Sequence, residues 1–176
     1  EVDTTIESIL ASSSLKLAGL NVPVHNSYKM DGRGDMLPQA SQKAISILSQ
    51  NPKGFFLMIE GSQIDWAEHG NDQVNLINET IDFDKALGIA LDFAQKDGHT
   101  LVVVTADHET GGVTITGGNK IKHEVKLQFS TTRHTAVMVP VYAFGPGAEK
   151  FTGIYDNTAF FGKFMELYGF QMNIGK

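Results

Sequence analysis

The sequence contains no cysteine, and this absence restricts the chemistry that the chain can perform. Disulfide bonds and thiolate metal ligands are excluded, so any zinc ion would have to be held by histidine, aspartate and glutamate side chains. Proteins of reducing and of oxidising compartments can both lack cysteine, so this absence leaves the compartment open.

Long apolar runs and clusters of basic residues are also absent. No apolar stretch approaches the ~20 residues that a transmembrane helix needs, and the sequence starts at Glu1 without the apolar region of a signal peptide. The formal net charge is −6, and with no Lys/Arg cluster this argues against a nucleic-acid-binding surface. An anionic substrate would therefore need a local positive charge, which a bound metal can supply.

The sequence does have the composition of a globular domain. Its 176 residues are 41% hydrophobic and 19% charged, enough for one well-buried α/β or α+β domain. Residues 1–34 are polar and irregular, and they include the tripeptide Arg33-Gly34-Asp35. We interpret Asp35 as the N-cap of the helix that follows, rather than as part of an adhesion signal.

Regular apolar spacing begins at Met36. Helices are predicted at residues 36–51 and 74–97, and a final amphipathic helix is predicted from Asn157 and Thr158. Strands are predicted at residues 55–60, 101–104, 113–116 and 137–145. A strand, a long helix and a second strand are typical of a parallel βαβ unit, and strands that are apolar throughout suit a sheet covered on both faces. We therefore expect an α/β fold.

Side chains that commonly bind metals follow several of these predicted strands. Asp65 and His69 are four residues apart, which places them on one face of a helical turn. Asp107 and His108 follow residues 101–104, and His134 precedes the strand that starts near residue 137. Each pattern alone is more often a surface cap or ion pair. Their occurrence together, in glycine-rich loops at strand ends, favours a shared metal site.

Three segments, EGSQIDWAEHGND, TADHETGG and HTAVMVPVYAFGPGA, resemble the C-terminal metal-site motifs of bacterial alkaline phosphatases. KGFFLMIEG and FTGIYDNTAFFGKFMELYG are also similar to that family. The resemblance covers roughly residues 35–170, whereas residues 1–34 match poorly. It implies that residues 35–176 are the C-terminal portion of a catalytic domain. The expected fold is part of a doubly wound, mostly parallel sheet flanked by helices.

The resemblance also implies two zinc sites. Asp65, His69 and His134 would bind the first zinc, and Asp107 and His108 would bind the second. In the family, a serine attacks phosphorus and forms a phosphoserine, which is then hydrolysed with the help of zinc. Two zinc ions suit such an in-line displacement because one can assist the attacking oxygen and the other the leaving oxygen.

Glu60 is implied as a magnesium ligand, and Trp66 stands where other members carry lysine or histidine. The indole of Trp66 could donate a hydrogen bond near the substrate phosphate or simply pack against the metal loop. Arg133 is interpreted as a surface residue. His25, His99 and His123 lie in polar loops, where we expect no ligand role.

The serine nucleophile and the phosphate-binding arginine of the family match no segment of this sequence, so we assign no catalytic residue. The second zinc site and the magnesium site are therefore expected to be incomplete, and the chain alone is expected to be inactive. The resemblance implies phosphomonoester substrates, a homodimer or other self-association, and a periplasmic or secreted parent protein. Two alternatives remain: another metal-dependent phosphatase, phosphomutase or phosphodiesterase of the same superfamily, or a non-catalytic zinc-binding module.

Overall fold

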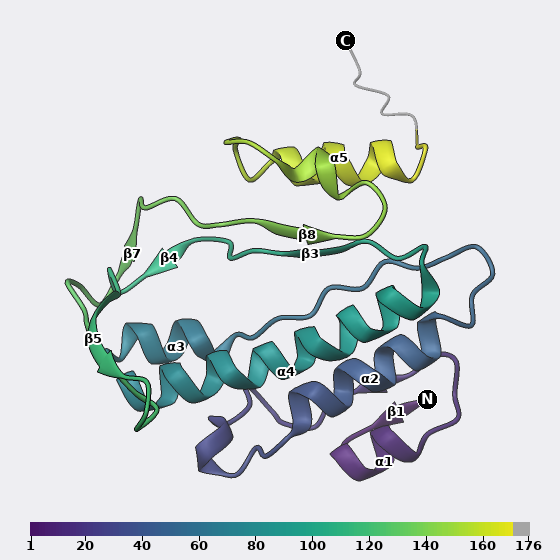
Figure 1. The fold of residues 1–176 in the computed structure, drawn as a ribbon. Coiled ribbons are helices and arrows are strands. Elements are labelled where there is room, and N and C mark those ends of the chain that lie inside the picture. Colours follow the sequence, from purple (N-terminus) through teal and green to yellow (C-terminus); the bar gives the residue numbers. More distant parts are fainter. Residues whose placement is uncertain (171–176) are drawn as a thin grey trace. The chain divides into compact units, whose positions relative to one another are not determined.

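The computed structural model describes residues 1–170 (Figure 1). The chain divides into two compact units. The first unit comprises Glu1–Ala90 and Thr110–Thr135, and the second comprises Leu91–Glu109 and Ala136–Lys176. Residues 171–176, which end the portion predicted at 35–176, lie outside the described residues.

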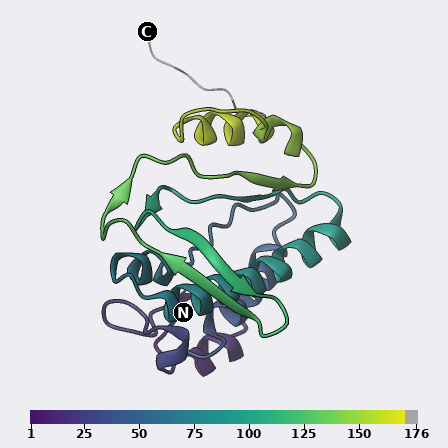
Figure 2. The same ribbon diagram turned by 60° about the vertical axis from the view of Figure 1, so that its left-hand side comes forward.

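The first unit is mainly helical. Its elements are β1 (Val2–Asp3), α1 (Ile6–Ala11), β2 (Ala18–Gly19), η1 (Lys29–Asp31), α2 (Met36–Leu48), α3 (Gln63–His69), most of α4 (Gln73–Asp97), β5 (Thr114–Asn119), β6 (Glu124–Gln128) and β7 (His134–Thr135). Helix α4 and strand β4 (Glu109–Thr110) each contribute residues to both units. The long helices α2 and α4 confirm the helical spacing of the sequence (Figure 2).

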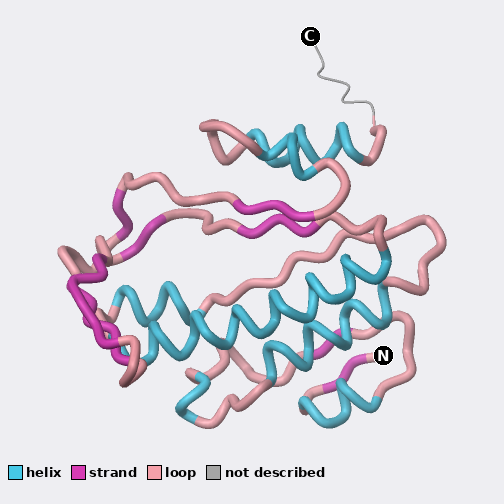
Figure 3. The backbone as a smooth tube through the Cα atoms, in the orientation of Figure 1, coloured by secondary structure: helices cyan, strands magenta, loops and turns pink. Residues whose placement is uncertain are grey.

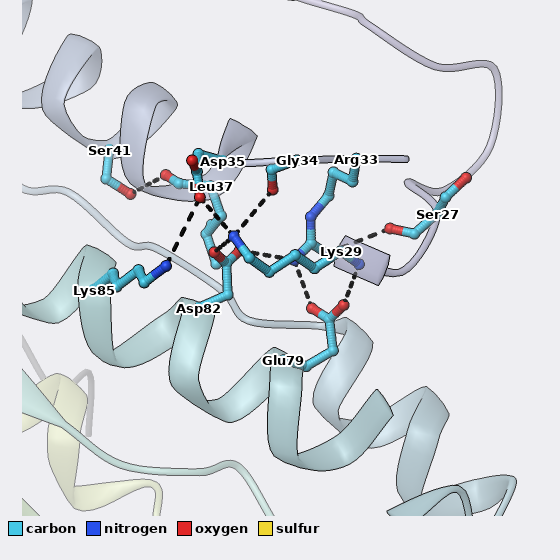
Figure 4. Close-up of polar contacts among 10 residues, drawn as sticks. All are labelled: Ser27, Lys29, Arg33, Gly34, Asp35, Leu37, Ser41, Glu79, Asp82 and Lys85. Atoms are coloured by element: carbon cyan, nitrogen blue, oxygen red, sulfur yellow. Dashed lines mark hydrogen bonds and ion pairs between the residues drawn. The ribbon is translucent and has the colours of Figure 1, made fainter. Parts of the chain in front are cut away.

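The start of α2 differs from the prediction in its chemistry. Asp35 occupies the N-cap position, but its side chain makes no capping hydrogen bond. Instead its carboxylate accepts a hydrogen bond from Lys29 Nζ at 2.6 Å and lies 3.9 Å from Lys85 Nζ (Figure 4). The hydrogen bond from Lys29 and its positive charge lower the pKa of Asp35. The Asp35 carboxylate thus accepts a hydrogen bond from an ammonium group and not from the backbone N–H groups at the start of α2.

The predicted strand at residues 55–60 is wrong for the part of the chain that the structure describes, because no strand is assigned there. Exposure still alternates along this segment, and the exposed fraction of Phe56 is 59% and that of Met58 is 76%. A strand is defined by a ladder of hydrogen bonds with a neighbour, and apolar composition does not supply that neighbour.

The strands pair in twos (Figure 3). β1 and β2 pair in parallel, β5 and β6 pair antiparallel, and β4 pairs with β7. The chain therefore combines helices and strands as an α/β protein, but the predicted mostly parallel sheet is not seen within residues 1–170. The reason is that the expected βαβ unit needed residues 55–60 as its first strand.

The second unit contains β3 (Val102–Val104), β8 (Tyr142–Phe144), η2 (Ala148–Phe151) and α5 (Ala159–Leu167). β3 and β8 are antiparallel, with Val103 opposite Ala143. The strand predicted from residue 137 is shortened, since Pro140 has no N–H to donate to a ladder. Phe151 is buried, and its ring centroid lies 5.6 Å from that of Phe164 on α5. No helix within residues 1–170 combines the length and apolarity needed to cross a membrane.

Candidate metal centre

The short helix α3 carries two of the predicted ligands. Asp65 and His69 are separated by one helical turn, and their side chains are 39% and 38% exposed. The opposite side of the helix is anchored in the interior, where Ala67 is fully buried and Gln63 is 4% exposed. Burial of one face therefore presents the carboxylate and the imidazole together at the surface of the first unit.

The TGG turn brings the third ligand to α3. Gly111 has a φ of 83°, a left-handed conformation that strongly favours glycine. Its N–H donates to the Arg133 carbonyl at 3.0 Å, and its carbonyl accepts from the N–H of Ser130 at 2.9 Å. A Cβ at this position would lie 3.3 Å from the Glu68 carbonyl oxygen on α3. The glycine thus allows a close approach that places His134, the residue after Arg133, beside the helix.

Asp65, His69 and His134 form a cluster of three potential ligand atoms that lie within 4.8 Å of one another. The Nε2 atoms of the two histidines are 3.2 Å apart, and His69 Nε2 lies 3.4 Å from Asp65 Oδ2. His134 Nε2 lies 3.7 Å from Asp65 Oδ1. Ligands at ~2.0–2.1 Å from a tetrahedral zinc ion would be about 3.4 Å apart. The spacing of these side chains therefore fits a zinc ion.

Two contacts orient these ligands. Thr110, which is 1% exposed, donates its hydroxyl hydrogen to Asp65 Oδ1 at 2.6 Å. His69 Nδ1 lies 2.7 Å from the Thr132 carbonyl oxygen, which can only accept, so Nδ1 is the donor and, in a neutral imidazole, Nε2 is the nitrogen with a lone pair for a metal. His69 Nε2 is also the ring nitrogen that lies near Asp65 Oδ2 and His134 Nε2. A cation stabilises such converging acceptors, and supporting contacts of this kind are usual around metal ligands.

Sequence analysis missed both supporting residues. Thr110 belongs to the TADHETGG motif, so its place in the motif was a signal, but nothing local indicates that its hydroxyl reaches Asp65. Thr132 acts through its backbone carbonyl, which every residue possesses, so its side-chain identity carries no signal.

The remaining predicted ligands are not members of this cluster. Glu60 is exposed at the end of the 55–60 segment and is not a member of the three-residue cluster. Asp107 and His108 belong to the second unit, where His108 Nε2 lies 3.1 Å from Asp107 Oδ2. Arg133 is exposed, in agreement with its interpretation as a surface residue.

Trp66 directly follows Asp65 on α3 and is 52% exposed. Its ring stacks on the imidazole of His25, with centroids 5.2 Å apart and an interplanar angle of 15°. Trp66 therefore makes an aromatic packing contact, and the two roles expected for it near the phosphate or against the metal loop stay predictions. Its partner is a loop histidine for which the sequence indicated no role.

Comparison with known proteins places this chain in a family. The family described as alkaline phosphatase matches residues 4–128, a range that includes most of the irregular segment before residue 35. Alkaline phosphatase 4 of Bacillus subtilis is 35% identical over 195 residues, covering 73% of this chain and 42% of that protein. Alkaline phosphatase 3 of the same organism is 53% identical over 111 residues, covering 62% and 24%.

Solved structures agree. The alkaline phosphatase of the Antarctic bacterium TAB5 has a TM-score of 0.86 at 42% identity, covering 98% of this chain and 52% of that one. A variant of that enzyme with magnesium bound in its M3 site gives the same TM-score at 40% identity, with 98% and 53% covered. The chain thus spans 42% of the length of Alkaline phosphatase 4 and 52% of that of the TAB5 enzyme, about half of each. On these matches, the chain belongs to the alkaline phosphatase family.

Proposed function

We propose that this chain is the metal-binding portion of a zinc- and magnesium-dependent alkaline phosphatase, which hydrolyses phosphomonoesters. The observation that carries the proposal is the convergence of Asp65, His69 and His134 at spacings that fit one zinc ion. Membership of the alkaline phosphatase family supports the reaction class.

Within this site, each side chain has a defined task. Asp65 and the two histidines would hold the first zinc and leave a fourth position open, as catalytic zinc sites do. Thr110 would keep the Asp65 carboxylate in place through its short hydrogen bond, and the Thr132 carbonyl would keep His69 Nε2 directed at the ion. A zinc ion held there supplies positive charge to a phosphoryl oxygen and lowers the pKa of bound water.

Asp107 and His108 would bind the second zinc, and Glu60 would bind magnesium. Asp107 and His108 are only two protein ligands, fewer than the three or four of a complete zinc site. Glu60 is a single ligand, whereas magnesium prefers a site with several oxygen ligands. We therefore expect weak occupancy at both positions in this chain. The magnesium-bound TAB5 variant supports magnesium as a metal of the family.

We also propose that the serine nucleophile belongs to a part of the protein that this chain does not contain. Catalysis by covalent transfer needs a nucleophile held in line with the leaving oxygen, and no residue here is assigned that role. In this view residues 35–176 form the C-terminal portion of the catalytic domain, and residues 1–34 precede it. In the whole protein, the chain would form part of a doubly wound, mostly parallel sheet flanked by helices.

The parent protein would act on phosphomonoesters in the periplasm or outside the cell, as a homodimer. Self-association of this chain is consistent with its exposed large apolar side chains, which include Met58 at 76% and Ile154 at 86% exposure.

Zinc titration by isothermal calorimetry tests the proposal. The chain should bind zinc, and His69→Ala and His134→Ala should each lose most of that binding. His123→Asn is the matched control, because His123 is exposed in the turn between β5 and β6 at a φ of 55°, where asparagine is tolerated. Equal zinc binding by all four proteins would disprove the proposed site.

A further inference from the structure

His25 reaches the neighbourhood of the metal centre from a different part of the chain. It lies in the irregular segment between β2 and η1, and its ring stacks on Trp66 at a centroid distance of 5.2 Å. Both residues are exposed, so general burial does not force the two rings together. A nearly parallel pair at a surface indicates that the segment carrying His25 is held in place by other contacts.

Those contacts come from a buried ion network that begins two residues after His25 (Figure 4). Arg33 Nη2 lies 2.6 Å from Glu79 Oε2 and 2.8 Å from Asp82 Oδ2, and Arg33 Nη1 donates to the Ser27 carbonyl at 3.4 Å. Lys29 donates its backbone N–H to Glu79 Oε1 at 2.6 Å and its ammonium to Asp82 Oδ1 at 2.5 Å. Side-chain exposure is 5% for Arg33, 2% for Glu79 and 0% for Asp82. Residues 27–33 are therefore held against α4 by these hydrogen bonds and ion pairs.

Trp66, the other member of the stack, stands among the metal ligands on α3. It follows Asp65 directly and precedes His69 by three positions, a separation at which helical side chains are neighbours. The helix has seven residues and no side-chain N-cap hydrogen bond. A helix this short is not stable by itself, so its order depends on the contacts that its side chains make with the rest of the first unit.

We propose that His25 is a positioning residue of the metal centre: by stacking on Trp66 it helps to hold α3 in the conformation that presents Asp65 and His69 to the ion. The proposal rests on the zinc site proposed above. The ion network fixes the segment, the segment places the imidazole on the indole, and the indole is fixed to the helix that carries both ligands. His25 acts through its flat ring and not as a ligand.

The size of the effect follows from preorganisation. If α3 is less ordered before zinc arrives, part of the binding free energy is used to order it, and the measured affinity falls. An aromatic pair contributes modestly beyond its area, so loss of the stack should weaken zinc binding about three- to tenfold. Loss of a direct ligand should weaken it much more.

The test uses the whole chain, zinc alone as the probe, and Trp66 as a built-in reporter, because it is the only tryptophan in the sequence. His25→Ala should weaken zinc binding about three- to tenfold by calorimetry and make Trp66 fluorescence more accessible to acrylamide quenching. His25→Phe keeps a flat ring without ligand nitrogens, so it should stay within about twofold of the parent chain in both measurements. His123→Asn serves again as the control.

The possible outcomes are distinct. Zinc binding that is unchanged in His25→Ala would overturn the positioning role while leaving the zinc site intact. Equal losses in His25→Phe and His25→Ala would also overturn it, because the imidazole nitrogens and not the ring stack would then be required. Absence of zinc binding by the parent chain would instead disprove the metal site itself. Far-UV circular dichroism of each variant should show the same total helix content as the parent chain, most of which comes from α2 and α4.

Discussion

Replacing Arg33 by methionine should strongly destabilise the first unit. The substitution removes the guanidinium that lies 2.6 Å from Glu79 and 2.8 Å from Asp82, and both carboxylates are almost completely buried. Removing one partner of a buried ion pair typically costs about 3–5 kcal/mol, because the other charge stays buried without compensation. Lys29 still donates to both acidic residues, so we expect the lower end, about 3 kcal/mol.

Urea denaturation followed by Trp66 fluorescence measures this effect, since Trp66 lies in the first unit. With a denaturant slope of about 1–3 kcal/mol/M, a loss of about 3 kcal/mol lowers the urea midpoint by at least about 1 M. Such a loss is a large share of the roughly 5–15 kcal/mol that stabilises a typical domain.

Lys85→Met is the matched control. Lys85 also faces an acidic residue, Asp35, but the two side chains are 53% and 62% exposed and 3.9 Å apart, so the midpoint should hardly change. Glu79→Gln should lower the free energy of unfolding less in the Arg33→Met variant than in the parent chain. In that variant the substitution removes a charge that has already lost its partner. Equal midpoints for Arg33→Met and Lys85→Met would refute the reasoning.

Three further outcomes are expected. Thr110→Val should weaken zinc binding about tenfold by calorimetry, because it removes the hydroxyl that donates a hydrogen bond to Asp65. Thr110→Ser keeps a hydroxyl and should bind zinc as the parent chain does; equal affinities of the two variants would contradict this role. Hydrogen bonds from Lys29 and from the Asn75 backbone N–H lower the pKa of Asp35 and Asp72 below the ordinary 3.8. Their stabilising contribution is therefore present above about pH 4 and is lost as the pH falls through the lower pKa values of the folded state. The urea concentration at the unfolding midpoint of the metal-free chain should therefore decrease when the pH is lowered below about 4; a midpoint unchanged down to pH 3 would argue against this. The chain alone should not hydrolyse p-nitrophenyl phosphate at alkaline pH with zinc and magnesium present, because it lacks an assigned nucleophile; turnover at rates typical of enzymes would show that a nucleophile has been overlooked.

Local sequence patterns determined the family and much of the local structure. Helical spacing predicted α2, α4 and α5 close to their observed bounds, because apolar residues recur at helical intervals along each of these segments. The four-residue separation of Asp65 and His69 put both on one face of α3, and the three motifs in order identified alkaline phosphatases. Information of this kind is contained in neighbouring residues, so a sequence read in short windows retains it.

Contacts between distant segments were decided by the tertiary structure. His134 meets His69 across 65 residues only because the Gly111 turn lets two loops approach α3 closely. Asp35 was expected to cap a helix but pairs with Lys29, and His25 was assigned no role although it stacks on Trp66. Residues 55–60 have the composition of a strand, yet strand formation requires a neighbouring backbone. In each case the outcome depends on which groups the folded chain brings within a few ångströms, and spacing along the sequence does not specify that.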